Sequence, residues 1–277
     1  MTQVNSKSGF ESPEDWEKFS AYLTSTNRFF IKARWQRFLN ALRKTAVKRT
    51  TYLEKNRTLA RARIGSRDEM YEDEHGVPQR YFGPLSIQEL GPPPKEETRD
   101  GRANPKGIPY LYLSTKVRTA IAEVRPWIKA DVSVGIWKTR RRLKILDLTM
   151  DNPKTHPSNF NILTGERAEQ KYTEEEIDPY VWGDINRAFS LPIQPGLEEK
   201  YYIPTQCIAE FVKNRGYQGI AYKSSVDEEG YNVVLFKPNY ARLIGAQCFG
   251  VSKIIYETKE NANGYSVGKR RRKSVVR

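Results

Sequence analysis

The sequence has few of the side chains that bind metals or form disulfides. Its 277 residues include two cysteines, Cys207 and Cys248, and two histidines, His75 and His156. Two cysteines form no disulfide framework, and together with the histidines they show no metal-ligand spacing. We therefore expect no metal site and a cytoplasmic location.

Long apolar runs are also missing. No stretch approaches the ~18 apolar residues of a membrane span, and residues 1–19 lack the charged and then apolar layout of a secretory signal. The mean hydropathy is −0.72, but 12% of the residues are aromatic, which argues against wholesale disorder. We expect a protein with a real core and no membrane partner.

Acidic residues are scarce at both ends of the chain. Residues 1–60 hold 12 Lys and Arg against 5 Asp and Glu, and residues 241–277 hold 9 against 2. The middle, residues 61–240, holds 26 of each sign. This distribution indicates a neutral enzyme core with basic attachments, not a domain built around a nucleic-acid groove. Nucleic acid bound through the basic ends stays an alternative, although a solubilising role is expected for the tail at 269–273.

Periodicity predicts helices at the N-terminus and short strands elsewhere. Ser12 and Pro13 are typical of a helix start, Trp16 follows on its apolar face, and a second helix is expected over about residues 28–49. Residues 65–98, broken by Gly and Pro, are predicted to be a loop with one short turn, which would suit a lid. The remaining predicted elements are strands at 131–137, 143–148, 217–225, 232–236, 243–248 and 251–256 and helices at 182–189 and 201–215, with hairpin tips at 138–142 and 227–230.

The stretch from Arg99 to Trp127 is the centre of the sequence pattern. It divides into a basic turn, a strand and a helix, at residues 101–107, 108–113 and 119–124. Gly, Asn and Pro favour the basic turn, and alternating apolar residues favour the strand. Ser114 or Thr115 is expected to cap the helix, which Pro126 ends.

Arg102, Tyr112 and Glu123 come from these three adjoining elements, so they can converge on one pocket. A guanidinium binds phosphate oxygens, an aromatic ring stacks on a ligand, and a carboxylate balances positive charge at a glycosidic carbon. The set suits a ligand that is phosphorylated and cationic, as NAD is. A surface arginine, a core tyrosine and a solvated glutamate would have the same spacing, so spacing alone does not decide between the two.

Arginines also alternate along the strand predicted at residues 59–64. Arg61 and Arg63 share one face, opposite Ala60 and Ala62. Two arginines side by side are costly to bury without an anion, which favours a phosphate site. An edge strand protected by charge is the alternative.

These residues together resemble the RES-domain family, whose name stands for Arg, Glu and Ser. The likeness rests on Arg61-Ala62-Arg63, GRANPKGIPYLYLS with TAIAEVRPW, and the closing GIAYKSSVDEEGYNVVLF. It covers about residues 58–240, and three motifs in the family's order are more specific than any one of them. One departure is Ala60, which stands where the family often has an aromatic residue.

The resemblance implies an α+β fold, with a mixed split-sheet core similar to ADP-ribosyltransferases and an N-terminal helical appendage. The mixture of short strands and a few helices agrees with that class. We expect a basic helical extension at residues 1–57, the NAD-cleaving domain at 58–240, and C-terminal strands with a basic tail at 241–277.

The resemblance also implies the reaction and the partners. The expected activity is cleavage of NAD at the nicotinamide–ribose bond, by phosphorolysis with inorganic phosphate as co-substrate or by hydrolysis, with no further cofactor. The expected role is a growth-inhibiting toxin paired with a cognate antitoxin. An ADP-ribosyltransferase acting on a macromolecule, a nucleic-acid-binding protein and an inactive mobile-element protein stay open, as does a homo-oligomer.

Residue roles follow from the same resemblance. Glu123 and Arg61 are the expected catalytic residues, with Arg63 the alternative to Arg61. Ser224 matches the family's serine, with Ser225 the alternative, and no His lies near it in the sequence to act as its base, so it is expected to bind substrate. The expected substrate-binding residues are Arg102, Tyr112, Ser224, Ser225, Arg63 and Asn232.

Overall fold

The structure is a computed structural model in which residues 9–150, 172–192, 198–255 and 258 are described. The helices are α1 (Asp15–Ser25), α2 (Ala33–Thr45), α3 (Ile87–Leu90), α4 (Val117–Glu123), α5 (Glu174–Ser190) and α6 (Glu198–Lys213). The strands are β1 (Thr50–Leu53), β2 (Thr58–Ile64), β3 (Arg67–Glu72), β4 (Pro78–Gly83), β5 (Leu111–Ser114), β6 (Asp131–Thr139), β7 (Leu143–Asp147), β8 (Gly219–Lys223), β9 (Tyr231–Leu235) and β10 (Ala241–Gly250). The predicted basic tail at 269–273 lies outside the described residues. Within them, no helix combines the length and the apolar character needed to cross a bilayer.

Eight of the described strands form one sheet, in the order β1-β7-β8-β9-β5-β2-β6-β10. Neighbouring strands are antiparallel except for the parallel pair β7 and β8. β5 and β2 share a single residue pair, Ala60 with Ser114, which we call the seam. The seam divides the sheet into β1-β7-β8-β9-β5 and β2-β6-β10, and apolar side chains from both parts, among them Leu59, Leu111 and Val233, share one cluster.

This mixture of helices and a mixed sheet confirms the predicted α+β class. The predicted likeness to the ADP-ribosyltransferase fold stays a prediction.

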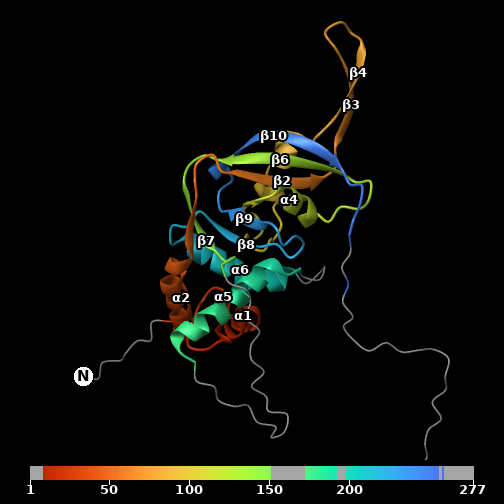
Figure 1. Cartoon of the computed structure of the whole chain (residues 1–277). Coiled ribbons are helices and arrows are strands. Elements are labelled where there is room, and N and C mark those ends of the chain that lie inside the picture. The colour runs from red at the N-terminus through yellow and green to blue at the C-terminus, as the bar shows by residue number, and fades with distance from the viewer. Residues whose placement is uncertain (1–8, 151–171, 193–197, 256–257, 259–277) are drawn as a thin grey trace, which may run out of the picture.

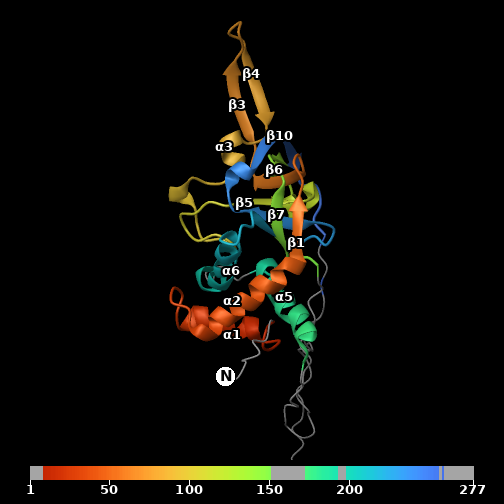
Figure 2. The same cartoon turned by 90° about the vertical axis from the view of Figure 1, so that its left-hand side faces the viewer.

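The helices α1, α2, α5 and α6 gather at one end of the molecule (Figures 1 and 2). Phe10, Phe19 and Trp182 belong to one buried cluster that also includes residues of β7, β8 and β9. The indole Nε1 of Trp182 donates a hydrogen bond of 3.1 Å to Thr45 Oγ1 and so links α5 to α2. The two N-terminal helices therefore share their core with the helices that follow. The predicted domain boundaries at residues 57 and 240 stay a prediction.

The helix α4 covers the other side of β2, where it packs on Ala60 and Ala62. The predicted cap is wrong: the residue at the N-cap is Lys116, and its side chain makes no capping hydrogen bond. Ser114 and Thr115 form other hydrogen bonds, to the Asn232 side chain and to the Tyr231 carbonyl. The hydroxyls of Ser114 and Thr115 therefore bond to residues on the neighbouring strand and are not available to cap the helix, contrary to the expectation from the local sequence.

The predicted loop at 65–98 contains a hairpin instead. β3 and β4 pair from Arg67 with Gly83 to Glu72 with Pro78, and the resulting arm projects from the body (Figures 1 and 2). Arg80 and Asp68 form an ion pair of 2.6 Å within the arm. The sequence pattern did not predict these strands because they are short and polar and lack alternating apolar residues. The short turn predicted near residue 87 is confirmed as α3, which begins with a capping box.

The predicted hairpin around residues 138–142 is also wrong. β6 pairs with β2 and β10, and β7 pairs with β1 and β8. The connection therefore crosses from one part of the sheet to the other. The second predicted hairpin, with its tip at 227–230, is confirmed as β8 and β9.

We predict that Phe19→Ala lowers the free energy of unfolding by about 3–5 kcal/mol, a usual loss for a large core aromatic. Phe19 is 0% exposed, and its ring stacks on Phe38 at 4.5 Å between centroids. The control is Phe29→Ala, because Phe29 is 89% exposed and its loss should cost less than about 0.5 kcal/mol. Urea unfolding followed by circular dichroism measures both. Equal stabilities would show that α1 is not part of the common core.

Candidate active site

A carboxylate held by two side-chain donors lies where four elements meet. Ser224 Oγ donates to Glu123 Oε1 at 2.7 Å, and Asn232 Nδ2 donates to the same oxygen at 2.5 Å. Ser114 Oγ donates in turn to Asn232 Oδ1 at 2.7 Å. These residues come from the end of α4, the turn after β8, and strands β9 and β5. We call Glu123, Ser224, Asn232 and Ser114 the Glu123 cluster.

The cluster is buried on one side and open on the other. Asn232 and Ser114 are buried, whereas Glu123 is exposed and Ser224 is partly exposed. Ser114 lies directly opposite Asn232 in the sheet, so strand register fixes this contact. The geometry presents a carboxylate to solvent on a rigid, hydrogen-bonded base.

The turn that carries Ser224 is fastened to α4. Thr119 Oγ1 donates to Asp227 Oδ2 at 2.6 Å, and Arg118 pairs with Asp227 at 3.6 Å. The Gly230 backbone packs so closely on the Thr119 side chain that a Cβ at Gly230 would lie 1.9 Å from Thr119 Oγ1. This clamp holds Ser224 at a fixed distance from the helix that ends at Glu123.

The basic turn is closed around the phenol of Tyr112. The Tyr112 hydroxyl donates to Asn104 Oδ1 at 2.8 Å and accepts from the Ala103 N–H at 3.0 Å. A Cβ at Gly101 would lie 2.4 Å from Asn104 Oδ1, so glycine is needed there. From α6, Gln206 Nε2 lies 3.0 Å from each of three acceptors, which are the carbonyls of Asn104 and Gly101 and the Asp100 Oδ1 that precedes the turn. Burial raises the pKa of Tyr112, and the phenol stays neutral at physiological pH.

Arg102 lies at the C-terminal end of α5. Its Nη1 donates to the carbonyl oxygens of Ala188 and Leu191, where the helix dipole favours a cation. Its guanidinium carbon is 5.8 Å from the centroid of the Tyr202 ring. Arg102 therefore joins the basic turn to the helical layer.

Tyr222 connects these pieces, although the sequence did not mark it as a site residue. It lies on β8 directly opposite Asn232 and is buried. Burial and the neighbouring Tyr112 raise its pKa, the charge of Arg102 opposes that shift, and the charge of Glu123 adds to it. Tyr222 is thus within electrostatic range of three predicted site residues, which the structure brings to one region.

Arg61 reaches the seam from β2. Its Nη1 donates to the Tyr112 carbonyl at 3.3 Å, and it lies opposite Gly135 in the ladder of β2 and β6. Burial, with a smaller contribution from the charge of Arg63, lowers the pKa of Arg61 to about 10. Arg63 Nη2 donates to the Gly91 carbonyl at 2.9 Å. In the described part of the chain, the Nε atoms of Arg61 and Arg63 are buried without a hydrogen-bond partner.

Arg61 and Glu123 approach the seam from different sides. Alternation along β2 puts Arg61 on the face of Leu59, which packs with β5, β6 and β9. Glu123 is on α4, which packs on the opposite face at Ala60 and Ala62. No contact joins Arg61 to Arg102 among the described hydrogen bonds and ion pairs. Two groups of predicted site residues therefore flank the seam.

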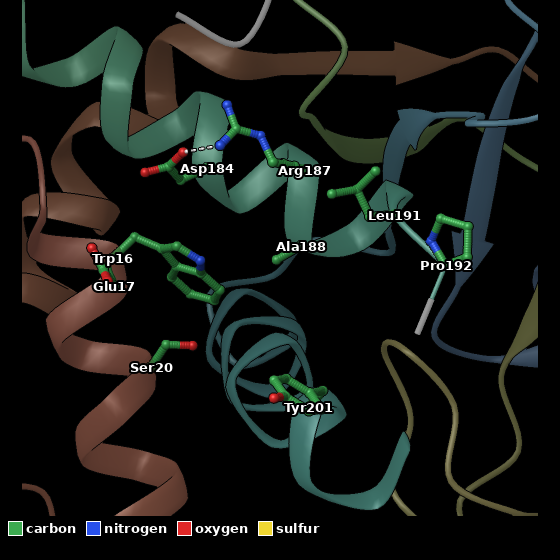
Figure 3. A pocket seen from close by; sticks show the side chains of 9 residues that line it. All are labelled: Trp16, Glu17, Ser20, Asp184, Arg187, Ala188, Leu191, Pro192 and Tyr201. Carbon is green, nitrogen blue, oxygen red and sulfur yellow. Dashed lines mark ion pairs between the residues drawn. The ribbon is translucent and has the colours of Figure 1, made fainter. Parts of the chain in front are cut away.

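A cavity of about 370 Å³ lies next to the residues that bind Arg102 (Figure 3). It opens between α1, α5 and α6, and at its edge Asp184 and Arg187 form an ion pair of 3.2 Å. Its wall includes Ala188 and Leu191, whose carbonyls accept from Arg102. The lining residues are Trp16, Glu17, Ser20, Asp184, Arg187, Ala188, Leu191, Pro192 and Tyr201. None of the Glu123 cluster lines it.

The family model of the RES domain matches residues 77–248, which is more than half of the chain. The chain belongs to the RES domain family. The match includes the Glu123 cluster, Arg102 and Tyr112 and begins after β2, so it does not include Arg61 or Arg63.

Among solved structures, this RES domain protein is similar to the crystal structure of the M. tuberculosis MbcT-MbcA toxin-antitoxin complex. The identity is 15%, the similarity covers 75% of this chain and 90% of that chain, and the TM-score is 0.35. We base no conclusion on a similarity of that size. No curated protein matches the chain.

Sequence reasoning missed the residues that support the site. Asn104 and Gln206 close the basic turn, and Ser114 orients Asn232. Gln206 had no local signal, because its contact joins segments far apart in the chain. Of the two candidate serines, Ser224 is the one that contacts Glu123, and Ser225 is exposed.

We predict that Gly230→Ala destabilises the protein by about 1–3 kcal/mol, the usual cost of overpacking. The added methyl group would force Thr119 and the turn that carries Ser224 apart. Gly245→Ala is the control, because a Cβ there has no heavy atom within 4 Å and should change stability by less than about 0.5 kcal/mol. Urea unfolding compares the two, and similar midpoints would contradict the close approach.

Proposed function

We propose that this RES domain protein cleaves NAD between nicotinamide and ribose, as a growth-inhibiting toxin of a toxin–antitoxin pair. The supporting observation is the Glu123 carboxylate, of which one oxygen accepts from Ser224 and Asn232. No hydrogen bond to its other oxygen, Oε2, occurs among the described residues, and the side chain is exposed. Family membership and the resemblance of the sequence motifs support the same substrate.

The chemistry requires little from the protein beyond charge and position. The nicotinamide ring nitrogen is cationic in NAD, so the leaving group needs no proton. What remains is to stabilise an oxocarbenium-like ribose and to place phosphate or water against it. In this proposal Glu123 faces the developing positive charge, and Ser224 and Asn232 hold its carboxylate or a ribose hydroxyl.

Cations for the pyrophosphate would come from both sides of the seam. Arg61 and Arg63 are adjacent on one strand face, and each has a buried Nε without a partner in the described chain. Guanidinium groups buried without an opposite charge are costly unless an anion binds them. Arg102 would supply a further cation from the basic turn, and Tyr112 would provide the aromatic surface.

The products show which molecule receives the ADP-ribose group. Purified protein incubated with NAD and inorganic phosphate should release nicotinamide. ADP-ribose 1″-phosphate among the products indicates phosphorolysis, free ADP-ribose indicates hydrolysis, and a labelled macromolecule indicates ADP-ribosyl transfer. An absence of nicotinamide release from folded protein would contradict the proposal.

We predict that Glu123→Gln loses at least ~100-fold in kcat, a typical loss for one electrostatic contact to the transition state. The substitution keeps the size and the hydrogen-bond acceptor, so the fold and NAD binding should remain. Glu228→Gln is the matched control, because Glu228 is an exposed glutamate in the tip of the β8–β9 hairpin, which also carries Ser224. Nicotinamide release measures kcat, and wild-type turnover in Glu123→Gln would contradict the assignment.

We also predict that Arg61→Ala and Arg102→Ala each raise the KM for NAD roughly tenfold or more, because a charge-assisted contact contributes ~1.5–3 kcal/mol. Lys should rescue each position only partly, because an ammonium lacks the two-pronged fork. The double variant should lose less than the sum of the single variants if both cations bind one pyrophosphate.

The four-member cycle separates binding from a structural role. If Arg61 only supports the Tyr112 carbonyl, its loss would lower stability and leave the KM of the folded fraction unchanged. If the KM values change by less than twofold, add up in the double variant and return to wild type at about 0.5 M salt, both arginines are screened surface charges and do not bind the pyrophosphate.

A further inference from the structure

Three segments far apart in sequence form a concave basic surface. A cavity of about 260 Å³ is lined by Lys55, Asn56, Arg140 and Arg242, all of them exposed. They come from the β1–β2 turn, the β6–β7 connection and the start of β10. Figure 1 shows the β6–β7 connection and the start of β10 at the same end of the sheet. We call these four residues the basic hollow.

The backbone around the basic hollow is fixed by hydrogen bonds. The Asn56 N–H donates to the Thr139 carbonyl and the Arg57 N–H to Thr139 Oγ1, both at 2.9 Å. The Arg140 N–H donates to the Tyr240 carbonyl at 2.9 Å. Thr139 is itself fully buried. The cations therefore start from a preorganised frame, which lowers the entropic cost of binding.

The charges of this surface have the same sign and repel one another. Lys138 lies directly opposite Arg242 in the ladder of β6 and β10, and like charges at that position destabilise a sheet. Among the described residues Lys55, Lys138, Arg140 and Arg242 form no ion pair. Nearby Arg142, in contrast, pairs with Glu54 at 2.9 Å. The repulsion is left uncompensated in the chain, and an anion in the hollow would relieve it.

More cations adjoin the basic hollow than one phosphate can neutralise. Arg57 and Arg141 extend the surface along the same two turns, and Arg141 lies 5.1 Å over the Tyr240 ring. A row of cations matches a ligand with regularly repeated anionic groups, and the phosphate backbone of a nucleic acid has them. Turns of this kind contact phosphates and present no element to the base edges.

We propose that the basic hollow binds the phosphodiester backbone of nucleic acid without sequence preference. The site is separate from the proposed NAD site, since it shares no residue with the Glu123 cluster, Arg61 or Arg102. The charge count along the sequence did not locate it, because Lys55, Arg140 and Arg242 belong to three segments far apart in the chain, which folding brings to this edge.

The test is the salt dependence of binding to a short fluorescein-labelled DNA duplex, measured by anisotropy with the full chain. The slope of log K against log salt is about −0.9 for each phosphate neutralised. Arg140→Ala with Arg242→Ala should therefore make the slope less steep by about 1.8. Arg140→Lys with Arg242→Lys should keep the wild-type slope, because a phosphate accepts an ammonium as well.

The control pair is Arg43→Ala with Lys44→Ala, which removes the same charge from the exposed face of α2 and should leave the slope unchanged. NAD cleavage by the Arg140/Arg242 pair should match wild type. A wild-type slope in that pair, a loss in the control pair instead, or binding to phosphatidylserine vesicles without binding to the duplex would each overturn the proposal.

Discussion

The narrow joint between the two parts of the sheet determines how the rest of the molecule is arranged. At the seam β2 and β5 share the pair Ala60 and Ser114 and then separate, so further backbone groups of β5 need other partners there. Arg61 donates to one of them, the Tyr112 carbonyl. On the other face, α4 packs against β2 and ends at Glu123. In a continuous ladder the backbone of β2 would pair with the Tyr112 carbonyl, and Arg61 would lose this acceptor.

Residues outside the proposed site hold its side chains in position. The Glu123 cluster depends on the clamp between Thr119 and Asp227, and the basic turn depends on Gln206 from α6. Arg102 ties the same turn to the end of α5. Elements from the sheet, from α4 and from the helical layer therefore hold one region together. Loss of any one support should disturb positions of several site residues, which is how a preorganised site behaves.

Sequence reasoning succeeded where a pattern was local and strong. Apolar alternation identified β2 and the hairpin of β8 and β9, and the spacing of Ser224 and Glu123 within family-like motifs marked two side chains that form a hydrogen bond. It failed where a distant partner decides the outcome. Ser114 does not cap the helix, because the strand register places it opposite Asn232, to which its hydroxyl donates a hydrogen bond. The polar strands of the arm pair without an apolar signal, and the β6–β7 connection is a crossover that no local rule distinguishes from a hairpin.

The arm of β3 and β4 has a practical consequence. An isolated two-stranded ribbon is only marginally stable in water, and this one is held within itself by its ladder and by pairs such as Arg80 with Asp68. Its amide protons should exchange with solvent faster than those of the main sheet. Its tip at His75 and Gly76 extends away from the body (Figure 2). A fluorophore or a short peptide tag inserted at this tip would report on the protein in cells without touching the fold that carries the Glu123 cluster.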